Sequence, residues 1–343
     1  MNGTERIKAL LEGKKADRVP VSGWLHMPTV DRYVDKFVEA TIEFTDKNDW
    51  DFIKVMPNGH HLAEAYGGKI HFLEDPRRWS ADIEEYPIKT AEDLVNLPVL
   101  DPKENPVLKR EVEVVRRLAE HYKGTKPILP TLFNSITWVQ EMTHSTVPTE
   151  TLDFIHNHNK ELHQALETIL QTNIKLVDAY VEAGADGFFI ASQYANSDLL
   201  TLEEFKELNT DYDLRLLEHI NKKTWFNLLH VHGDKNLYIE EFAKYPVQAI
   251  NWENTPAGQK EEEITSIKKA RSLFGGILIG GTDQHHDFYG SREEVKAVLK
   301  KRLKQALEED TTGAFILAPG CALPLDVDRD IFTLFKEVVE EIK

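Results

Sequence analysis

Short apolar runs alternate with longer amphipathic stretches along almost the whole chain, and this alternation limits the possible folds more than any other feature. Each run is rich in Val, Ile, Leu or Phe and is bounded by Gly, Pro or polar residues, as buried strands are. We predict strands at the following runs: Val19–Leu25, Phe52–Met56, Pro127–Phe133, Gly187–Ala191, Trp225–Val231, Val247–Trp252, Gly276–Ile279 and Gly313–Leu317.

The stretches between these runs have the spacing of helices. In the longest stretch, apolar residues from Leu166 to Val177 recur at intervals of three and four residues, as a helix packed on a sheet requires. Repeated strand–helix units predict a parallel sheet with helical crossovers. We predict helices at the following segments: Glu111–Tyr122, Leu152–Ala183, Leu202–Ile220, Ile239–Ala243, Ile264–Ser272, Arg292–Glu308 and Asp328–Ile342.

The number of these units predicts how the sheet is arranged. Eight strand–helix units in a chain of 343 residues favour a closed (β/α)₈ barrel over an open doubly wound sheet. We therefore predict a single barrel domain over residues 1–343, preceded by an N-terminal helix. The stretch from Gly67 to Pro106 fits no strand–helix unit and is expected to form an extended excursion over the barrel.

Composition and charge limit the binding partners and the compartment. The chain has 41 Lys and Arg against 58 Asp and Glu, a net charge of −17, which argues against a broad surface for nucleic acid or an anionic membrane. No apolar run approaches the roughly 20 residues that span a bilayer. The first residues lack the apolar centre of a signal peptide, and a single cysteine, Cys321, excludes an intramolecular disulfide. We therefore expect a cytoplasmic protein.

Polar residues gather at the predicted strand ends. In a (β/α)₈ barrel the catalytic groups come from the carboxyl ends of the strands and the loops that follow them. Seven of the 14 histidines and the only cysteine fall at these ends. We expect the following residues to line a substrate pocket there: His26, Asn58, His60, Asn134, Ser192, Gln193 and His285.

The sharpest local pattern is His230-x-His232 in the fifth predicted strand segment. Side chains two apart on a strand point to the same face, so both imidazoles can face the barrel mouth. With the thiolate of Cys321 from the eighth strand end, they would form a three-ligand zinc site with a fourth position left for water or substrate. The alternative is that both histidines are hydrogen-bonded mouth residues and that Cys321 is a small buried hydrophobe.

Two carboxylates are candidates for catalytic roles. Asp283 follows a Gly-Gly turn and could act as a general base or bind a substrate amide, with stabilisation of the turn as the alternative. Glu253 could orient a ligand or pair with a surface lysine. The sequence contains no P-loop, no G-x-G-x-x-G after the first strand and no nucleophile elbow.

Three segments resemble the uroporphyrinogen decarboxylase superfamily. Residues Thr4–Val21 are similar to its opening, a helix that ends in glycine followed by a D-R-V-P-V type start of the first strand. Gly280–Asp283 resembles its G-N-x-D turn, and Gly320–Asp326 resembles its final strand-end loop. The resemblance covers nearly the whole chain and implies a (β/α)₈ barrel with the site at the C-terminal mouth, and a homodimer.

The resemblance to the decarboxylases of this superfamily is incomplete. Those enzymes remove carboxylates from a tetrapyrrole without a metal or cofactor, and an R-Q-A-G-R-like segment after the first strand holds the anionic substrate. The matching segment here, Trp24–Arg32, lacks that motif, and their last-loop histidine matches Cys321. Their aspartate after the second strand falls near Phe52, one position from Asp51, and such a slip turns a side chain to the other face. The cations near the predicted mouth are few: Arg32, Lys54 and Lys235.

The corrinoid- and thiol-dependent methyltransferases of the superfamily resemble the chain more closely at the site. They bind zinc through H-x-C and a later cysteine, which match His230, His232 and Cys321, with histidine replacing the first cysteine. The resemblance implies zinc-dependent transfer of a methyl group to a thiol from a corrinoid protein or a small methyl donor, with Asp283 and Glu253 orienting groups or exchanging protons. Uroporphyrinogen decarboxylation and a non-catalytic barrel that binds a metal or small ligand stay open as alternatives.

Overall fold

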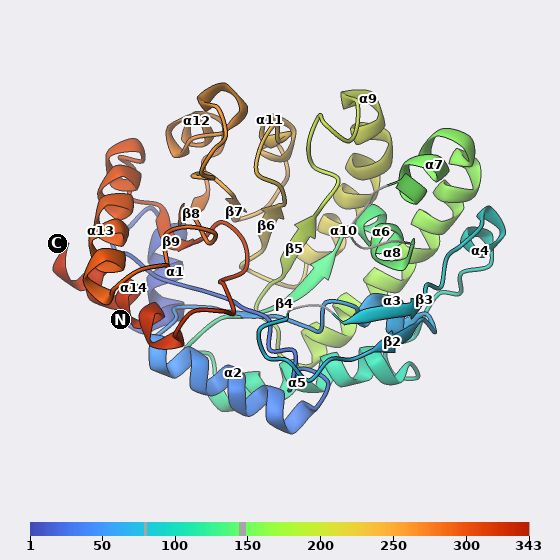
Figure 1. Cartoon of the computed structure of the whole chain (residues 1–343), viewed down its shortest axis with the longest axis horizontal. Helices are drawn as coiled ribbons and strands as arrows, with labels where there is room; N and C mark the ends of the chain where they lie inside the picture. Colours follow the sequence, from blue (N-terminus) through green and yellow to red (C-terminus); the bar gives the residue numbers. More distant parts are fainter. Residues whose placement is uncertain (79–80, 144–148, 343) are drawn as a thin grey trace.

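Seven parallel strands form one curled sheet at the centre of the molecule (Figure 1). The computed structural model describes residues 1–78, 81–143 and 149–342. Every pair of neighbouring strands in this sheet runs parallel, as the alternation of strands and helices predicts. In their order across the sheet, the strands are β1 (Ile53–Val55), β4 (Ile128–Phe133), β5 (Phe189–Ser192), β6 (Leu228–Val231), β7 (Ala249–Trp252), β8 (Ile277–Thr282) and β9 (Phe315–Pro319).

Helices surround the outside of the sheet (Figure 1). Apart from the N-terminal helix, whose Ile7 and Leu10 belong to the smaller cluster, they bury apolar faces against it and form, with the outward side chains of the strands, the larger of two apolar clusters. The helices outside the excursion are α1 (Gly3–Leu11), α2 (Val34–Asn48), α3 (His61–Ala65), α5 (Pro106–Tyr122), α6 (Ser135–Thr143), α7 (Thr149–Asn157), α8 (Asn159–Glu182), α9 (Leu202–Phe205), α10 (Asp211–Asn221), α11 (Ile239–Phe242), α12 (Ile267–Leu273), α13 (Arg292–Glu309) and α14 (Leu334–Glu341).

Helices occupy the segments predicted for them, with differences in their bounds and interruptions; α5, for example, begins at Pro106, five residues before its predicted start. The stretch Leu152–Ala183 is divided into α7 and α8 at His158. The stretch Leu202–Ile220 contains a π-helical turn at Lys206–Thr210 between α9 and α10. The last stretch begins with a 3₁₀ turn at Arg329–Thr333 before α14. Helices α2, α3 and α6 had no counterpart among the predicted helices.

The first predicted strand, Val19–Leu25, contributes a single bridge between Val21 and Leu317 of β9. The amide of Leu317 donates to the carbonyl of Pro20 at 3.0 Å, and on the other side the amide of Asp51 donates to the carbonyl of Val21 at 2.8 Å. This segment therefore lies between β9 and the residues before β1. The parallel sheet has seven strands, and a closed eight-stranded barrel is not confirmed.

The inward side chains of the strands form a second apolar cluster in the space that the sheet curls around. Phe52 and Phe226, next to strands that are not neighbours in the sheet, contact each other with ring centroids 5.6 Å apart. Trp24 packs on Phe189 in the same way at 5.1 Å. The interior is therefore packed with side chains, and a ligand can reach the strands only from the sheet's edge.

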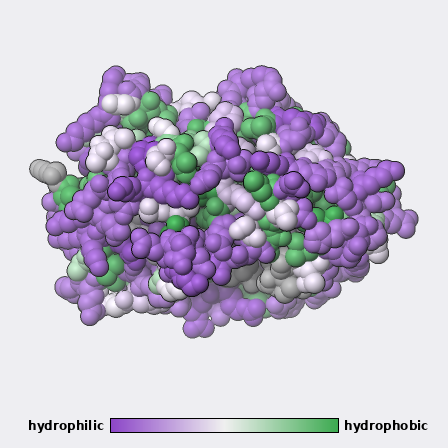
Figure 2. All heavy atoms as spheres, turned by 90° about the horizontal axis from the view of Figure 1, so that it is seen from above, coloured by the Kyte–Doolittle hydropathy of each residue, from purple (hydrophilic) through white to green (hydrophobic). Residues whose placement is uncertain are grey.

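The described residues of the stretch 67–106 lie outside the seven-stranded sheet. They form the antiparallel pair β2 (Lys69–His71) and β3 (Asp82–Glu85) and the short helix α4 (Ala91–Val95), which packs against α8. The face of the molecule in Figure 2 is largely hydrophilic, with apolar residues in small separate groups. Of the helices in the described part of the chain, none combines the length and apolar character that a bilayer crossing requires.

Asp51 joins three segments at the amino end of the sheet. Its fully buried carboxylate accepts hydrogen bonds from Arg6 of α1 at 2.8 Å, from Arg18 at 2.7 Å and from the amide of Val21 at 2.7 Å. Asp51 precedes β1, so it stands at the opposite edge from the carboxyl ends of the strands. Its role is to hold α1 and the Val21 segment against the sheet.

We predict that Asp51→Asn lowers the free energy of unfolding by about 3–5 kcal/mol, because it removes the buried anion that Arg6 and Arg18 share and leaves them only the more exposed Asp17 and Asp49. Denaturant unfolding measures this loss. The control Asp17→Asn removes an exposed partner of Arg6 and should cost about 1 kcal/mol or less. Equal losses in the two variants would contradict the assigned role of Asp51.

Candidate metal centre

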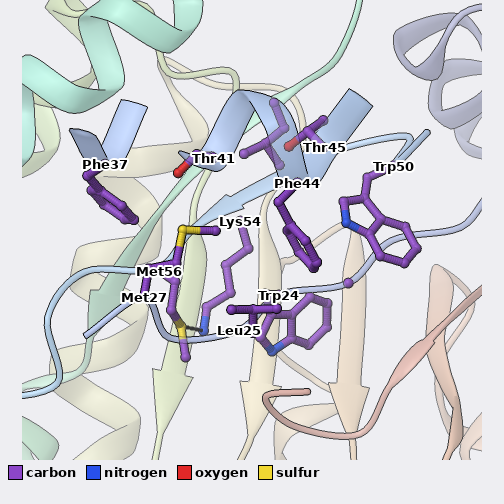
Figure 3. Close-up of a pocket in the computed structure, with 12 residues that line it drawn as sticks. Trp24, Leu25, Met27, Phe37, Thr41, Phe44, Thr45, Trp50, Lys54 and Met56 are labelled. Carbon is purple, nitrogen blue, oxygen red and sulfur yellow. Dashed lines mark hydrogen bonds between the residues drawn. The ribbon is translucent and has the colours of Figure 1, made fainter. Parts of the chain in front are cut away.

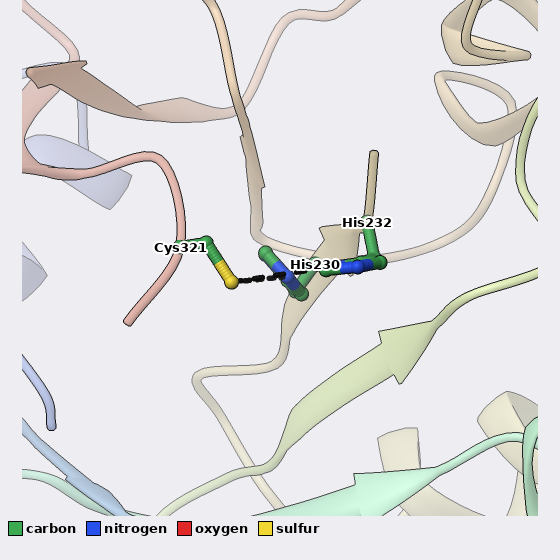
Figure 4. Close-up of side chains that lie close together, drawn as sticks. All are labelled: His230, His232 and Cys321. Atoms are coloured by element: carbon green, nitrogen blue, oxygen red, sulfur yellow. Dashed lines mark hydrogen bonds between the residues drawn. The ribbon is translucent and has the colours of Figure 1, made fainter. Parts of the chain in front are cut away.

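Two imidazoles and one thiol converge at the carboxyl edge of the curled sheet. His230 lies on β6, His232 directly follows that strand, and Cys321 lies two residues beyond the end of β9. The Sγ atom of Cys321 is 3.8 Å from Nε2 of His230 and 3.8 Å from Nδ1 of His232. Figure 4 shows the three side chains pointing toward one another. These residues are named the His–His–Cys group below.

The His–His–Cys group has the dimensions of a metal site. Its three ligand atoms all lie within 4.8 Å of one another, and among the described residues it is the group of metal-ligating side chains that meets this criterion. Tetrahedral zinc bonds of about 2.3 Å to sulfur and 2.0–2.1 Å to nitrogen place sulfur and nitrogen about 3.6 Å apart. The observed distances differ from that value by only a few tenths of an ångström, so these donors fit a zinc ion.

Asn251 of β7 fixes the tautomer of His230. The register of the sheet places these two residues side by side, and Oδ1 of Asn251 lies 2.6 Å from Nδ1 of His230. The Asn251 amide nitrogen donates to the carbonyls of Ile279 and Pro319, each at 3.0 Å, so its oxygen must face the imidazole. His230 therefore carries its proton on Nδ1 and directs the lone pair of Nε2 toward Cys321, as metal-binding histidines do.

Cys321 and His232 shift each other's pKa. Burial would raise the pKa of Cys321, but its contacts with His230 and His232 hold that pKa well below its usual range. Burial would lower the pKa of His232, but the hydrogen bond and charge of Cys321 raise it to about 9. These opposite shifts favour a thiolate beside an imidazolium when no metal is bound.

A cavity of about 360 Å³ opens beside His232. Gln284 connects the wall of this cavity to the His–His–Cys group. Its Nε2 donates to Glu253 at 2.8 Å, and its Oε1 accepts from the amide of Cys321 at 3.2 Å. Burial and the nearby Cys321 raise the pKa of Glu253. The residues that line this cavity are His232, Gly233, Asp234, Glu253, Pro256, Ala257, His285 and His286.

Asp283 lies next to this cavity with both carboxylate oxygens engaged. One oxygen accepts from the amide of His285 at 2.8 Å, and the other accepts from the amide of Ala257 at 3.0 Å. The second oxygen also lies 2.9 Å from Nδ1 of His286. These bonds fit the turn-stabilising interpretation of Asp283. The ring of His285 is 67% exposed, and its Nε2 lies 3.8 Å from Glu253.

The amide of Asn134 and the hydroxyl of Ser192 lie in a polar network behind the strands. Asn134 donates to Ser192 at 3.1 Å and to Asn209 of the π-helical turn at 2.7 Å. It is also 3.3 Å from Asp213, whose pKa burial raises to about 7. The structure therefore does not bring these two predicted pocket residues to the His–His–Cys group.

The predicted pocket residues Asn58 and His60 bond to residues outside the His–His–Cys group. Asn58 donates to the carboxylate of Asp31 at 3.2 Å, and Nε2 of His60 is 3.1 Å from the carbonyl of Ala81. Burial lowers the pKa of His26 to about 3, so its ring is neutral.

Gln193 lies nearer to the site, because it holds Glu141, a carboxylate that interacts electrostatically with His232. Its Nε2 donates to Glu141 at 3.0 Å, and its Oε1 accepts from Gln140 at 2.7 Å. Burial raises the pKa of Glu141 to about 7, although its hydrogen bond from Gln193 and the charge of His232 oppose that rise.

Lys54 of β1 points into the interior of the sheet. Its ammonium lies 4.1 Å from the centroid of the Phe189 ring and 5.7 Å from that of Trp24. Burial lowers the pKa of Lys54 to about 7, and the charge of Cys321 opposes this lowering. Figure 3 shows its side chain running past Trp24 to the sulfur of Met56.

Sequence reasoning did not assign roles to Asn251, Gln284 or Glu141. Asn251 and Gln284 stand at predicted strand ends, but their partners depend on the sheet register and on the path of the β9 loop. Glu141 lies on α6, seven residues after the predicted strand end at Asn134, and no local pattern distinguishes it from a surface glutamate.

The fold and the site together define a class: a parallel α/β protein with a TIM-barrel-like curled sheet that gathers imidazole and thiol ligands at its carboxyl edge. The sequence model of the uroporphyrinogen decarboxylase (URO-D) family matches residues 2–342. The chain belongs to this family.

Related proteins of known sequence and structure include methyltransferases. The methylcobamide:CoM methyltransferase MtaA of Methanosarcina barkeri (strain Fusaro / DSM 804) is 22% identical over 337 residues, which cover 93% of this chain and 91% of the relative. The structure of a methyltransferase from Methanosarcina mazei matches with a TM-score of 0.82 and 19% identity, and the match covers 99% of both chains. A B12-independent methionine synthase from Shewanella sp. W3-18-1 matches with a TM-score of 0.53 and 12% identity over 95% of both chains.

We predict that Asn251→Leu weakens zinc binding about 10–100-fold, because His230 is then free to adopt the other tautomer and to rotate. A chelator competition assay measures the dissociation constant. The control Asn236→Gly removes a half-buried asparagine side chain after the same strand, β6, at a residue with a positive φ, and should leave zinc affinity unchanged. Unchanged affinity in Asn251→Leu would show that this bond does not orient the ligand.

We also predict the pH dependence of zinc binding. Zinc needs a neutral His232, and the raised pKa of this residue means that binding at pH 7 releases about one proton. The apparent affinity should therefore rise about tenfold per pH unit and level off near pH 9. Chelator competition across this range tests the slope. An affinity that is constant from pH 7 to pH 9 would contradict the thiolate–imidazolium pair.

Proposed function

We propose that the protein is an enzyme that transfers a methyl group to a thiol and that His230, His232 and Cys321 hold a zinc ion for this reaction. The observation that carries the proposal is the convergence of three competent zinc ligands within 4.8 Å of one another at the carboxyl edge of the sheet. In barrels of this kind, catalytic groups occupy that edge. The family and the methyltransferase relatives support the same reaction class.

Each part of the site has a role in this reaction. A zinc ion held by two neutral imidazoles and one thiolate keeps a net positive charge and lowers the pKa of a thiol that binds it. Asn251 keeps His230 in the ligating tautomer, and Gln284 positions the backbone of Cys321. Glu253 lines the cavity beside His232, and its raised pKa suits it to accept the thiol proton.

The reaction exchanges one bond to the methyl carbon for another. A sulfur–carbon bond forms, the bond between the methyl carbon and its carrier breaks, and the electron pair of the broken bond leaves with the carrier. The cavity beside His232 gives the substrate access to the His–His–Cys group. We propose a corrinoid protein or a small methyl donor as the carrier, and the methylcobamide named for the Methanosarcina barkeri relative supports a corrinoid.

Decarboxylation of uroporphyrinogen fits this site less well. A substrate with many carboxylates requires several cations at the mouth. Of the three candidate cations, Arg32 pairs with Glu74 and Lys235 lies beside Asp198, which leaves Lys54 facing the interior. Asp51 is bound by Arg6 and Arg18 at the opposite edge of the sheet. The site therefore favours methyl transfer over decarboxylation.

Metal analysis and a methyl-transfer assay on the same preparations test the proposal. We expect about one zinc ion per chain after reconstitution, and methylation of a simple thiol such as 2-mercaptoethanol with methylcobalamin as the donor. His232→Ala and Cys321→Ala should each lose most of the zinc and all measurable transfer, because each removes a ligand. His219→Ala, which alters a histidine on α10 paired with Asp178, is the matched control and should change neither result.

Three outcomes would contradict the proposal in different ways. A reconstituted protein without stoichiometric metal would remove its chemical basis. Stoichiometric zinc without transfer to any thiol would favour a non-catalytic barrel that binds metal. Turnover of uroporphyrinogen by the metal-free protein would establish the decarboxylase instead.

A further inference from the structure

A second cavity, of about 440 Å³, is distinct from the cavity beside His232, because no residue lines both. Its volume is in the range of sites that hold small organic ligands. It is named the Arg329 cavity below. Four segments that are far apart in the sequence form its wall: residues 27–30 after the first apolar run, Ala40 of α2, Pro76 and Arg77 of the excursion, and Leu325 and Arg329 of the loop after β9.

Most of the wall of the Arg329 cavity is apolar. Met27 is buried in the larger apolar cluster and also lines the small inner cavity in Figure 3. Val30, Ala40 and Leu325 are half-buried and pack against the same cluster. A ligand with an apolar body would remove the remaining exposed surface of these side chains from water, which favours binding.

The guanidinium of Arg329 has no anion to neutralise it. Among the described residues, none forms an ion pair or a hydrogen bond with this half-buried side chain. The carboxylates next to it in the sequence are engaged elsewhere, because Asp328 accepts from the amide of Asp330 at 3.0 Å and Asp330 pairs with Lys47. Burial lowers the pKa of Arg329, which shows that its charge has lost part of its hydration. An anion in the cavity would compensate for that loss.

The second arginine of the wall, Arg77, is exposed and already paired. Its Nε and Nη2 donate to Asp75 at 3.2 and 3.4 Å. None of the described residues that line the cavity is acidic. The cavity therefore carries one uncompensated positive charge in a chain whose net charge is −17. This balance matches a ligand with a single negative charge.

We propose that the Arg329 cavity is a binding site for a small monocarboxylate with an apolar body. The planar guanidinium of Arg329 binds the carboxylate through two parallel hydrogen bonds, and the apolar wall holds the body. The inference is independent of zinc and of methyl transfer, because none of the residues His230, His232 and Cys321 lines this cavity.

Calorimetry on the whole chain with 4-phenylbutyrate and 4-phenylbutanamide tests the inference. The two compounds share an apolar body and differ in the charged group. We expect the wild type to bind the carboxylate at least about tenfold more tightly than the amide, with or without zinc. Arg329→Met keeps an apolar side chain of similar length and removes the charge. It should therefore abolish this preference and change the affinity for the amide less than about twofold.

Two further variants separate the charge from the place of binding. Arg116→Met removes an arginine on α5 that pairs with Glu113 and Glu120, and it should keep the full preference for the carboxylate. Ala40→Phe puts a ring into the cavity and should weaken the binding of both compounds at least about tenfold. If Arg329→Met does not fold, the wild-type preference and Ala40→Phe still decide.

Four results would overturn the inference. The first is equal affinity of the wild type for the two compounds, and the second is no binding of 4-phenylbutyrate at millimolar concentration. The third is a preference for the carboxylate that persists in Arg329→Met, because another cation would then bind it. The fourth is competition by 2-mercaptoethanol in the zinc-loaded protein, which would place the carboxylate at the His–His–Cys group.

Discussion

The curl of the parallel sheet is the constraint on which the proposed site depends. Strands β6 and β9 are separated by β7 and β8 in the sheet order. With neighbouring strands about 4.8 Å apart, a flat sheet would hold residues of β6 and β9 about 14 Å apart. The Sγ atom of Cys321 nevertheless lies 3.8 Å from both imidazoles. The apolar interior that maintains this curl, with contacts such as Phe52 on Phe226, is therefore as necessary to the site as the ligands themselves.

The part of the site that could be predicted from sequence follows from one local rule. Because side chains two apart on a strand share a face, His230 and His232 had to point the same way, and both reach Cys321. The same rule explains why Ser192, which was expected to line the pocket, does not face the mouth. Ser192 is in register with Val231, which belongs to the outer apolar cluster, and so it faces the helices rather than the mouth. The alternation of side chains along a strand therefore predicts which face Ser192 points to, whereas its closeness to the strand end does not.

What could not be predicted depends on contacts between distant segments. The alternation of strands and helices gave the parallel α/β class, but the Val21 segment makes one bridge where a full strand was expected. Helical spacing over 202–220 could not reveal the π-helical turn that carries Asn209 into a buried network with Asn134. Asn251 meets His230 only because β6 and β7 pair in one register. The roles of these residues depend on tertiary contacts, and no local sequence pattern predicts them.

X-ray absorption spectroscopy of the zinc-loaded protein tests the central claim most directly, because it reports the ligand atoms around the metal. The account predicts one sulfur at about 2.3 Å and two imidazole nitrogens at about 2.0–2.1 Å. Addition of a thiol substrate should bring a second sulfur into the coordination shell. A spectrum with only nitrogen and oxygen neighbours would place the metal elsewhere and contradict the proposed site.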